Sequence, residues 1–209
     1  MNQPTLSRPM FSRLGAACGA VFAVVLVAAN GDGSQPFSGP RAIAGIAALT
    51  LAVPFLAYLC GVLRTAEGAD GWLAGAALAA GVTGITLKLG SGAPELAMVR
   101  AHLAAGTPLH TALDAIAGAA TVLSLYPLAV FCAATAIVGF RARALPRWLA
   151  AGAAVTAVAL AVNGGFLGTD SVPALLLFAL WTLLASVHLL RRTWRQPAPA
   201  AAAAAVARA

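Results

Sequence analysis

Ionisable side chains are scarce in this chain. Only 9% of its 209 residues are charged, and only six are Asp or Glu. Soluble domains have about 25% charged residues, so the composition excludes a water-soluble core. Hydrophobic residues make up 61% of the chain, and the mean hydropathy is +0.89. The sequence therefore predicts one compact, membrane-embedded helical domain.

Motifs of the common chemistries are also absent from the sequence. There is no Gly-rich phosphate loop, GxSxG nucleophile elbow, HExxH helix or paired-aspartate motif of the prenyltransferase type. Cys18, Cys60 and Cys132 lie inside apolar runs, without a CxxC spacing or a Cys–His cluster. They predict neither a disulfide nor a zinc site. We expect no metal and no cofactor.

Long apolar segments are what the sequence has in abundance. A membrane helix needs about 20 mostly apolar residues to cross roughly 30 Å of hydrocarbon. Six segments approach that length: Leu14–Ala29, Ala42–Leu63, Gly71–Leu89, Pro108–Phe140, Arg147–Leu167 and Pro173–Leu190. The fourth has 33 residues, which is about 50 Å as a helix, so its first turns should project beyond the outer membrane surface. The predicted fold is an all-α bundle of about six transmembrane helices.

The arginines and lysine predict how the bundle is oriented. Cytoplasmic loops carry an excess of Lys and Arg. With the N-terminus inside, ten of the thirteen basic residues fall on the cytoplasmic side, and only Arg41, Lys88 and Arg100 fall outside. Both ends are therefore predicted to be cytoplasmic. The net charge of +7 is explained by topology, so we expect no nucleic-acid partner.

Two short tails are predicted to flank the bundle. Residues 1–13 form a cytoplasmic tail, residues 14–192 the six-helix transmembrane domain, and residues 193–209 a disordered cytoplasmic tail rich in Ala and Pro. A secretory signal is an alternative for the N-terminus, because Arg8 and Arg13 precede an apolar run that ends in Val27-Ala28-Ala29. Cleavage there would leave five spans in the same orientation.

The one polar concentration lies between the third and fourth segments, on the predicted outer side. Residues Pro94–Ala105 are predicted to form a short interfacial helix, with an apolar stripe that begins at Leu96. Glu95 and His102 are seven residues apart and share one face of that helix. This outer segment is where chemistry is most expected.

His110 and Asp114 are four residues apart at the start of the fourth segment, so they share a helix face. A carboxylate so placed can orient an imidazole as a general base, or the two can act as neighbouring metal ligands. Glu95 or His102 would complete the site from the facing helix. The candidate catalytic residues are Asp114, His110, Glu95 and His102. A carboxylate near a helix N-terminus also stabilises the helix without any catalytic role.

We predict structural roles for two further polar residues within the apolar segments. Lys88 is expected to extend its amine to the outer interface. Asn163 is expected to hydrogen-bond between helices.

The C-terminal half resembles a large group of multi-pass membrane proteins from high-GC actinobacteria. The stretches that carry the resemblance are Pro127–Phe131, Arg141–Leu149, which contains the sequence ALPRWL, and Leu180–Arg192. The resemblance covers Leu14–Arg192 and implies a six-helix bundle in the plasma membrane. That group has no established activity, so it implies no functional residue here.

Three functions follow from the sequence as alternatives. The leading one is a non-enzymatic plasma-membrane protein that serves as an accessory component or handles a small molecule. The second is a membrane-embedded enzyme for a lipid or isoprenoid substrate, acting through the outer carboxylate and histidine cluster. The third is a small-molecule carrier. The expected partners are membrane lipids, a lipid or small-molecule ligand, and another membrane protein.

Overall fold

The computed structural model describes residues 8–30, 39–68, 71–167 and 172–195. These residues form six α-helices and one π-helical turn. The elements are α1 (Arg8–Asn30), α2 (Gly39–Glu67), α3 (Leu73–Arg100), α4 (Pro108–Arg141), α5 (Arg147–Val162), η1 (Asn163–Leu167) and α6 (Val172–Arg195). No strand occurs in the described ranges.

Five stretches of helix are long and apolar enough to cross a membrane. They are Ile43–Glu67, Leu73–Arg100, Pro108–Arg141, Arg147–Gly165 and Pro173–Trp194. The apolar part of α1, Ser12–Ala28, is shorter. The chain is thus an all-α membrane bundle of about six helices, as the sequence predicts.

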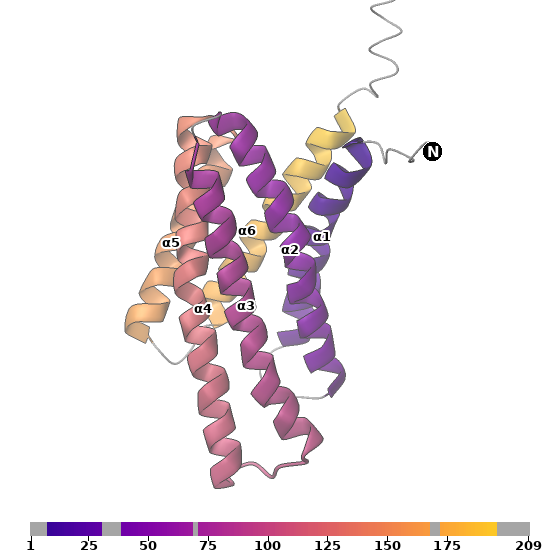
Figure 1. The fold of residues 1–209 in the computed structure, drawn as a ribbon, viewed down its shortest axis with the longest axis vertical. Helices are drawn as coiled ribbons and strands as arrows, with labels where there is room; N and C mark the ends of the chain where they lie inside the picture. Colours follow the sequence, from indigo (N-terminus) through magenta and orange to yellow (C-terminus); the bar gives the residue numbers. More distant parts are fainter. Residues whose placement is uncertain (1–7, 31–38, 69–70, 168–171, 196–209) are drawn as a thin grey trace, which may run out of the picture.

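Consecutive helices run in opposite directions, and the described chain begins and ends at the same end of the bundle (Figure 1). We call this the basic end, because Arg13, Arg64, Arg143 and Arg191 lie there. The opposite end, called the hairpin end, carries the turn between α3 and α4. In the packing, α1 lies against α2 and α6, while α4 lies between α3 and α5.

The α3–α4 hairpin extends beyond the other helices at the hairpin end (Figure 1). The 34 residues of α4 correspond to about 50 Å of helix, which exceeds the roughly 30 Å of a hydrocarbon core. The fourth segment was predicted to project beyond the outer membrane surface, and that projection stays a prediction.

The separate interfacial helix predicted at Pro94–Ala105 is not formed. Instead, α3 continues through Pro94 and ends at Arg100. Proline removes one backbone donor, and α3 tolerates this loss near its exposed end. The chain then reverses over residues 101–107, where His102 and Gly106 have φ of 48° and 84°.

Side chains cap two of the helix starts. The backbone N–H groups of Leu73 and Ala74 donate to the two carboxylate oxygens of Glu67, at 3.2 and 2.9 Å. At α4, the N–H of His110 donates to Thr107 Oγ1 at 3.3 Å. These bonds satisfy donors that a helix start leaves without intrahelical partners.

Small residues and aromatic rings bring the helices together. A Cβ added at Gly84 would lie 2.7 Å from Leu128 Cγ, so α3 and α4 touch there without an intervening side chain. Farther toward the basic end, Phe131 of α4 contacts Phe178 and Trp181 of α6 edge-on, at 6.4 and 6.0 Å between ring centroids. The contact at Gly84 holds α4 against α3, and these rings hold it against α6.

The predicted tails lie mostly outside the described residues. The first helix begins at Arg8, so residues 8–13 are helical. Likewise, α6 continues to Arg195. Residues 1–7 and 196–209 are not described.

Candidate functional site in the α3–α4 hairpin

Lys88 and Thr121 set the register of the α3–α4 hairpin. Lys88 Nζ donates to Thr121 Oγ1 at 2.8 Å. Because the two helices are antiparallel, a residue seven positions later on α3 lies level with one seven positions earlier on α4. This places Glu95 opposite Asp114, about 10 Å along the helix axis from the Lys88–Thr121 pair.

The structure brings two of the four predicted site residues to the same level. Glu95 is half-buried on α3, and it interacts electrostatically with both Lys88 and Asp114. Asp114 itself is exposed on α4. The hairpin therefore carries one acidic pair near its tip and one amine deeper in the bundle.

The two histidines are not joined to this pair. His110 is half-buried in the first turn of α4, and its backbone N–H donates to Thr107 just before the helix. His102 is exposed in the turn. No side-chain hydrogen bond links the four candidates, and no group of three His, Cys, Asp or Glu residues within the described ranges has the geometry to hold a metal. A catalytic role for Asp114, His110, Glu95 and His102 stays a prediction.

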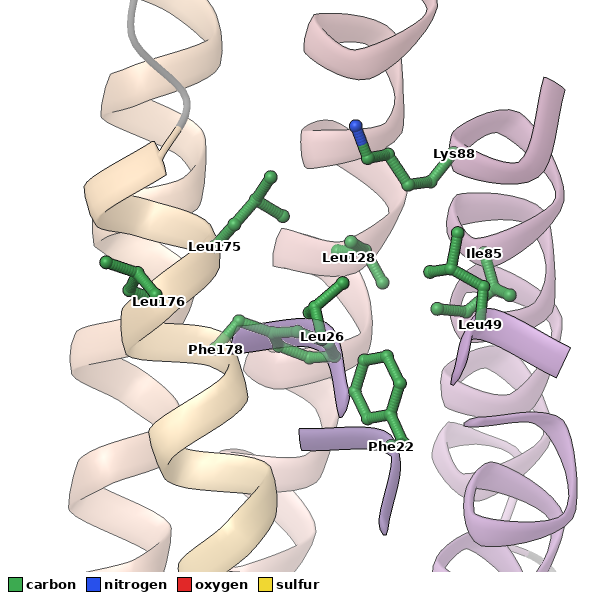
Figure 2. A pocket seen from close by; sticks show the side chains of 9 residues that line it. All are labelled: Phe22, Leu26, Leu49, Ile85, Lys88, Leu128, Leu175, Leu176 and Phe178. Carbon is green, nitrogen blue, oxygen red and sulfur yellow. The ribbon is translucent and has the colours of Figure 1, made fainter. Parts of the chain in front are cut away.

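Lys88 has a partner in the bundle that the sequence does not predict. Its amine was expected to reach the outer interface, but it turns into the bundle and bonds to α4. Figure 2 shows the amine at one end of an apolar cavity, on the same side as Leu175 of α6. The bond to Thr121 accounts for this orientation, because it gives the amine a partner inside the bundle.

The cavity lies where five helices meet, and its volume is about 40 Å³. One water molecule needs roughly 10–15 Å³ on this measure, so the cavity admits a few waters or a thin alkyl group. Its lining is apolar except at Lys88, and consists of Phe22, Leu26, Leu49, Ile85, Lys88, Leu128, Leu175, Leu176 and Phe178 (Figure 2).

The serine hydroxyl groups near Lys88 and Thr121 hydrogen-bond to backbone carbonyls. Ser91 Oγ donates to the Lys88 carbonyl at 2.7 Å, and Ser124 Oγ donates to the Thr121 carbonyl at 2.6 Å. Both serine hydroxyls therefore bond within their own helices. A lysine ammonium has three donors, and Thr121 is the one side chain of the described residues that accepts from it. A guest in the cavity can accept from the others.

The pairing of Lys88 with Thr121 was not among the predictions from the sequence. The signal was present in the turn Gly106-Thr107-Pro108, which fixes where the hairpin reverses. With the reversal centred near residues 104–105, residue 88 of an antiparallel hairpin falls opposite residue 121. Hydropathy alone gave no reason to make that comparison.

A second polar contact joins α4 to the end of α5. Tyr126 Oη donates to the Gly164 carbonyl at 2.9 Å, within the π-helical turn η1. Single π-helical turns are rare and often occur at functional positions. Here the contact is structural, since it holds η1 against α4. Asn163, from the same turn, is buried as expected for a residue with an interhelical role.

Comparison with known proteins identifies no relative. No protein-family model, curated protein or solved structure matches this chain.

Proposed function

We propose that this protein is a multi-pass plasma-membrane protein that binds a single-chain amphiphile in the cavity beside Lys88, without altering it chemically. Only a short stretch of alkyl chain next to the head enters the cavity, whose volume is about 40 Å³, and the rest of the chain lies outside it. An oxygen-bearing head, such as a carboxylate, accepts hydrogen bonds from the lysine amine. The basic end faces the cytoplasm in this proposal, following the excess of arginine there. The cavity then lies in the outer half of the bilayer.

The observation that carries the proposal is the position of Lys88. Among the described residues, it is the one charged side chain on the wall of an otherwise apolar cavity. A charge within the hydrocarbon region costs at least about 2.5–3.5 kcal/mol at the centre of a helix. Such residues are kept mainly where they serve a site, and a lone amine above an apolar cavity matches the two parts of an amphiphile.

Binding is better supported than catalysis. General acid–base chemistry needs a proton donor or acceptor within hydrogen-bond reach of the reacting group. The backbone positions of Glu95 and Asp114 are two helical turns, about 10 Å along the helix axis, from those of Lys88 and Thr121, and neither histidine is bonded to a carboxylate in the described residues. The cavity supplies donors and apolar contact, which are sufficient for binding.

The proposal can be tested by quenching of Trp181 fluorescence. Trp181 is buried, and its ring lies 6.3 Å from that of Phe178, which lines the cavity. Replacing the other three tryptophans by Phe leaves Trp181 as the only indole reporter. Dibrominated stearate, a heavy-atom quencher with a carboxylate head, is titrated into this variant in lipid nanodiscs.

Saturable quenching is expected, and Lys88→Met should weaken it by about tenfold to a hundredfold. A hydrogen bond to a charged group contributes about 1.5–3 kcal/mol, and each 1.4 kcal/mol is tenfold in affinity. Arg100→Met removes a charge from the exposed end of the same helix and is the matched control. Lys88→Arg should restore part of the binding. Equal quenching in the Lys88→Met variant, or equal loss in the control, would rule out the proposed site.

Catalysis at the hairpin tip is the second candidate, favoured by the position of Glu95 opposite Asp114 on the facing helix. It predicts that the purified protein changes the composition of a total lipid extract. Asp114→Asn should abolish that change and leave the unfolding temperature unaltered. An equal loss of folding would assign Asp114 a structural role instead.

A further inference from the structure

The basic end of the bundle holds a wide hollow between the α4–α5 connection and the end of α6. Its volume is about 700 Å³, and four of its lining residues are basic or titratable: Arg143, His188, Arg191 and Arg192. The wall is completed by Ala144–Pro146. Three guanidinium groups from two separate elements thus surround one hollow.

The shape of the connection directs Arg143 to this position. Arg143 has a φ of 51°, a left-handed conformation that is uncommon for residues other than glycine. Ala144 and Leu145, which follow Arg143, are buried, so the connection is anchored directly after the strained residue. Arg143 and Arg192 also line a second hollow of about 390 Å³, between the connection and the helices α1, α2 and α6.

No carboxylate neutralises these arginines among the described residues. Of the three acidic side chains in those ranges, only Glu67 lies at the basic end, and it is occupied in capping α3. Arg13, on α1, instead stacks over the ring of Trp194 at 5.5 Å. Within the described residues, the positive charge of Arg143, Arg191 and Arg192 thus has no carboxylate partner.

An apolar hollow adjoins the basic one. Val187, Leu190, Arg191 and Trp194 line a space of about 400 Å³ on α6, and Arg191 belongs to both hollows. The exposed rings of Trp72, Trp148 and Trp194 lie at the same end, and tryptophan favours the headgroup level of a bilayer. A charged hollow beside an apolar one matches the two parts of a phospholipid, its charged headgroup and its acyl chain.

We propose that the hollow formed by Arg143, Arg191 and Arg192 binds the phosphate of an anionic phospholipid of the cytoplasmic leaflet, with an acyl chain lying along Val187 and Leu190. Guanidinium groups bind phosphate through paired hydrogen bonds, and basic pockets between membrane helices on the cytoplasmic side hold anionic headgroups. This site is at the opposite end of the bundle from Lys88.

The test is native mass spectrometry of the full-length protein with added phosphatidylglycerol, with phosphatidylcholine as the neutral comparison and inorganic phosphate as the headgroup alone. We expect phosphatidylglycerol to bind preferentially. The double variant Arg143→Gln/Arg192→Gln should lower its affinity by about tenfold or more. The matched control is Arg64→Gln/Arg141→Gln, which removes two charges from the same end outside both basic hollows and should lower affinity less than threefold.

Three results would overturn the proposal. Equal loss in the control variant would show that only the overall positive charge matters. Equal binding of phosphatidylcholine would remove the role of headgroup charge. Binding of free phosphate that competes with the lipid at equal concentration would identify a soluble phosphate compound as the occupant. Amphiphile quenching at Trp181 is a separate readout, so failure here does not bear on the Lys88 cavity.

Discussion

Replacing Gly84 by alanine tests whether α3 and α4 pack as closely as the hairpin register requires. The new Cβ would lie 2.7 and 2.9 Å from two side-chain carbons of Leu128, and 3.2 Å from its backbone nitrogen. The nearest contact is about 0.8 Å shorter than the roughly 3.5 Å at which carbon atoms normally meet. Leu128 is buried, so it has little room to turn away.

The expected cost follows from these distances. Overpacking a well-packed core costs about 1–3 kcal/mol, and the change from glycine to alanine within a helix returns about 0.5–1 kcal/mol. A net destabilisation of about 1–2 kcal/mol should lower the apparent Tm by roughly 2–8 °C in a chain of this size. Gly75, on the same helix, has nothing within 4 Å of an added Cβ, so Gly75→Ala should be neutral or slightly stabilising.

The assay is thermal unfolding of the purified variants in one detergent at one scan rate, because membrane proteins commonly unfold irreversibly and the apparent Tm then depends on the rate. An apparent Tm for Gly84→Ala at or above that of the wild type, with Gly75→Ala unchanged, would refute the close contact of α3 and α4. The positions inferred for Glu95 and Asp114 would then lose their basis.

Three further predictions concern the helix connections and the orientation. Tyr126→Phe removes the bond to Gly164 and should lower the apparent Tm by about 2–4 °C, since one hydrogen bond contributes about 1 kcal/mol. Tyr58→Phe is its control and should change the Tm less. Glu67→Ala removes the cap of α3 and should cost about 0.5–2 kcal/mol, while Glu67→Gln, which keeps one acceptor oxygen, should cost less; equal losses would point to charge alone. Reporter domains that fluoresce only in the cytoplasm should be active when fused to either end, and a fusion active at one end alone would contradict an even number of crossings.

The sequence predicted the class of fold and the number of helices well, because the spans are set by hydropathy and length. It also indicated that the fourth segment is too long for a simple span. It was wrong about the segment after Pro94, because a proline near an exposed helix end costs one hydrogen bond and does not have to end the helix. The sequence alone does not show that the packing of α3 on α4 continues beyond Pro94, and this packing offsets the lost hydrogen bond.

The candidate site was harder to predict than the fold. A helix that is apolar on all sides gives no indication of which face meets its neighbours, so the direction of the Lys88 side chain could not be read from its own segment. Glu95 and Asp114 were expected to lie near each other, and the register of the hairpin places them opposite. Thr121 was not predicted as a site residue, because a single threonine in an apolar helix indicates a polar contact only when its partner on the neighbouring helix is known.

Photo-crosslinking with a palmitate that carries a diazirine in its chain tests the central claim most directly. If the amphiphile binds at Lys88, the label in membranes should be recovered on peptides containing cavity residues such as Leu26, Leu49 and Leu175. Lys88→Met should remove most of the label, while Arg100→Met should not. Label confined to residues exposed on the outside of the bundle, such as Val24 and Val155, or unchanged by Lys88→Met, would contradict an amphiphile site at Lys88.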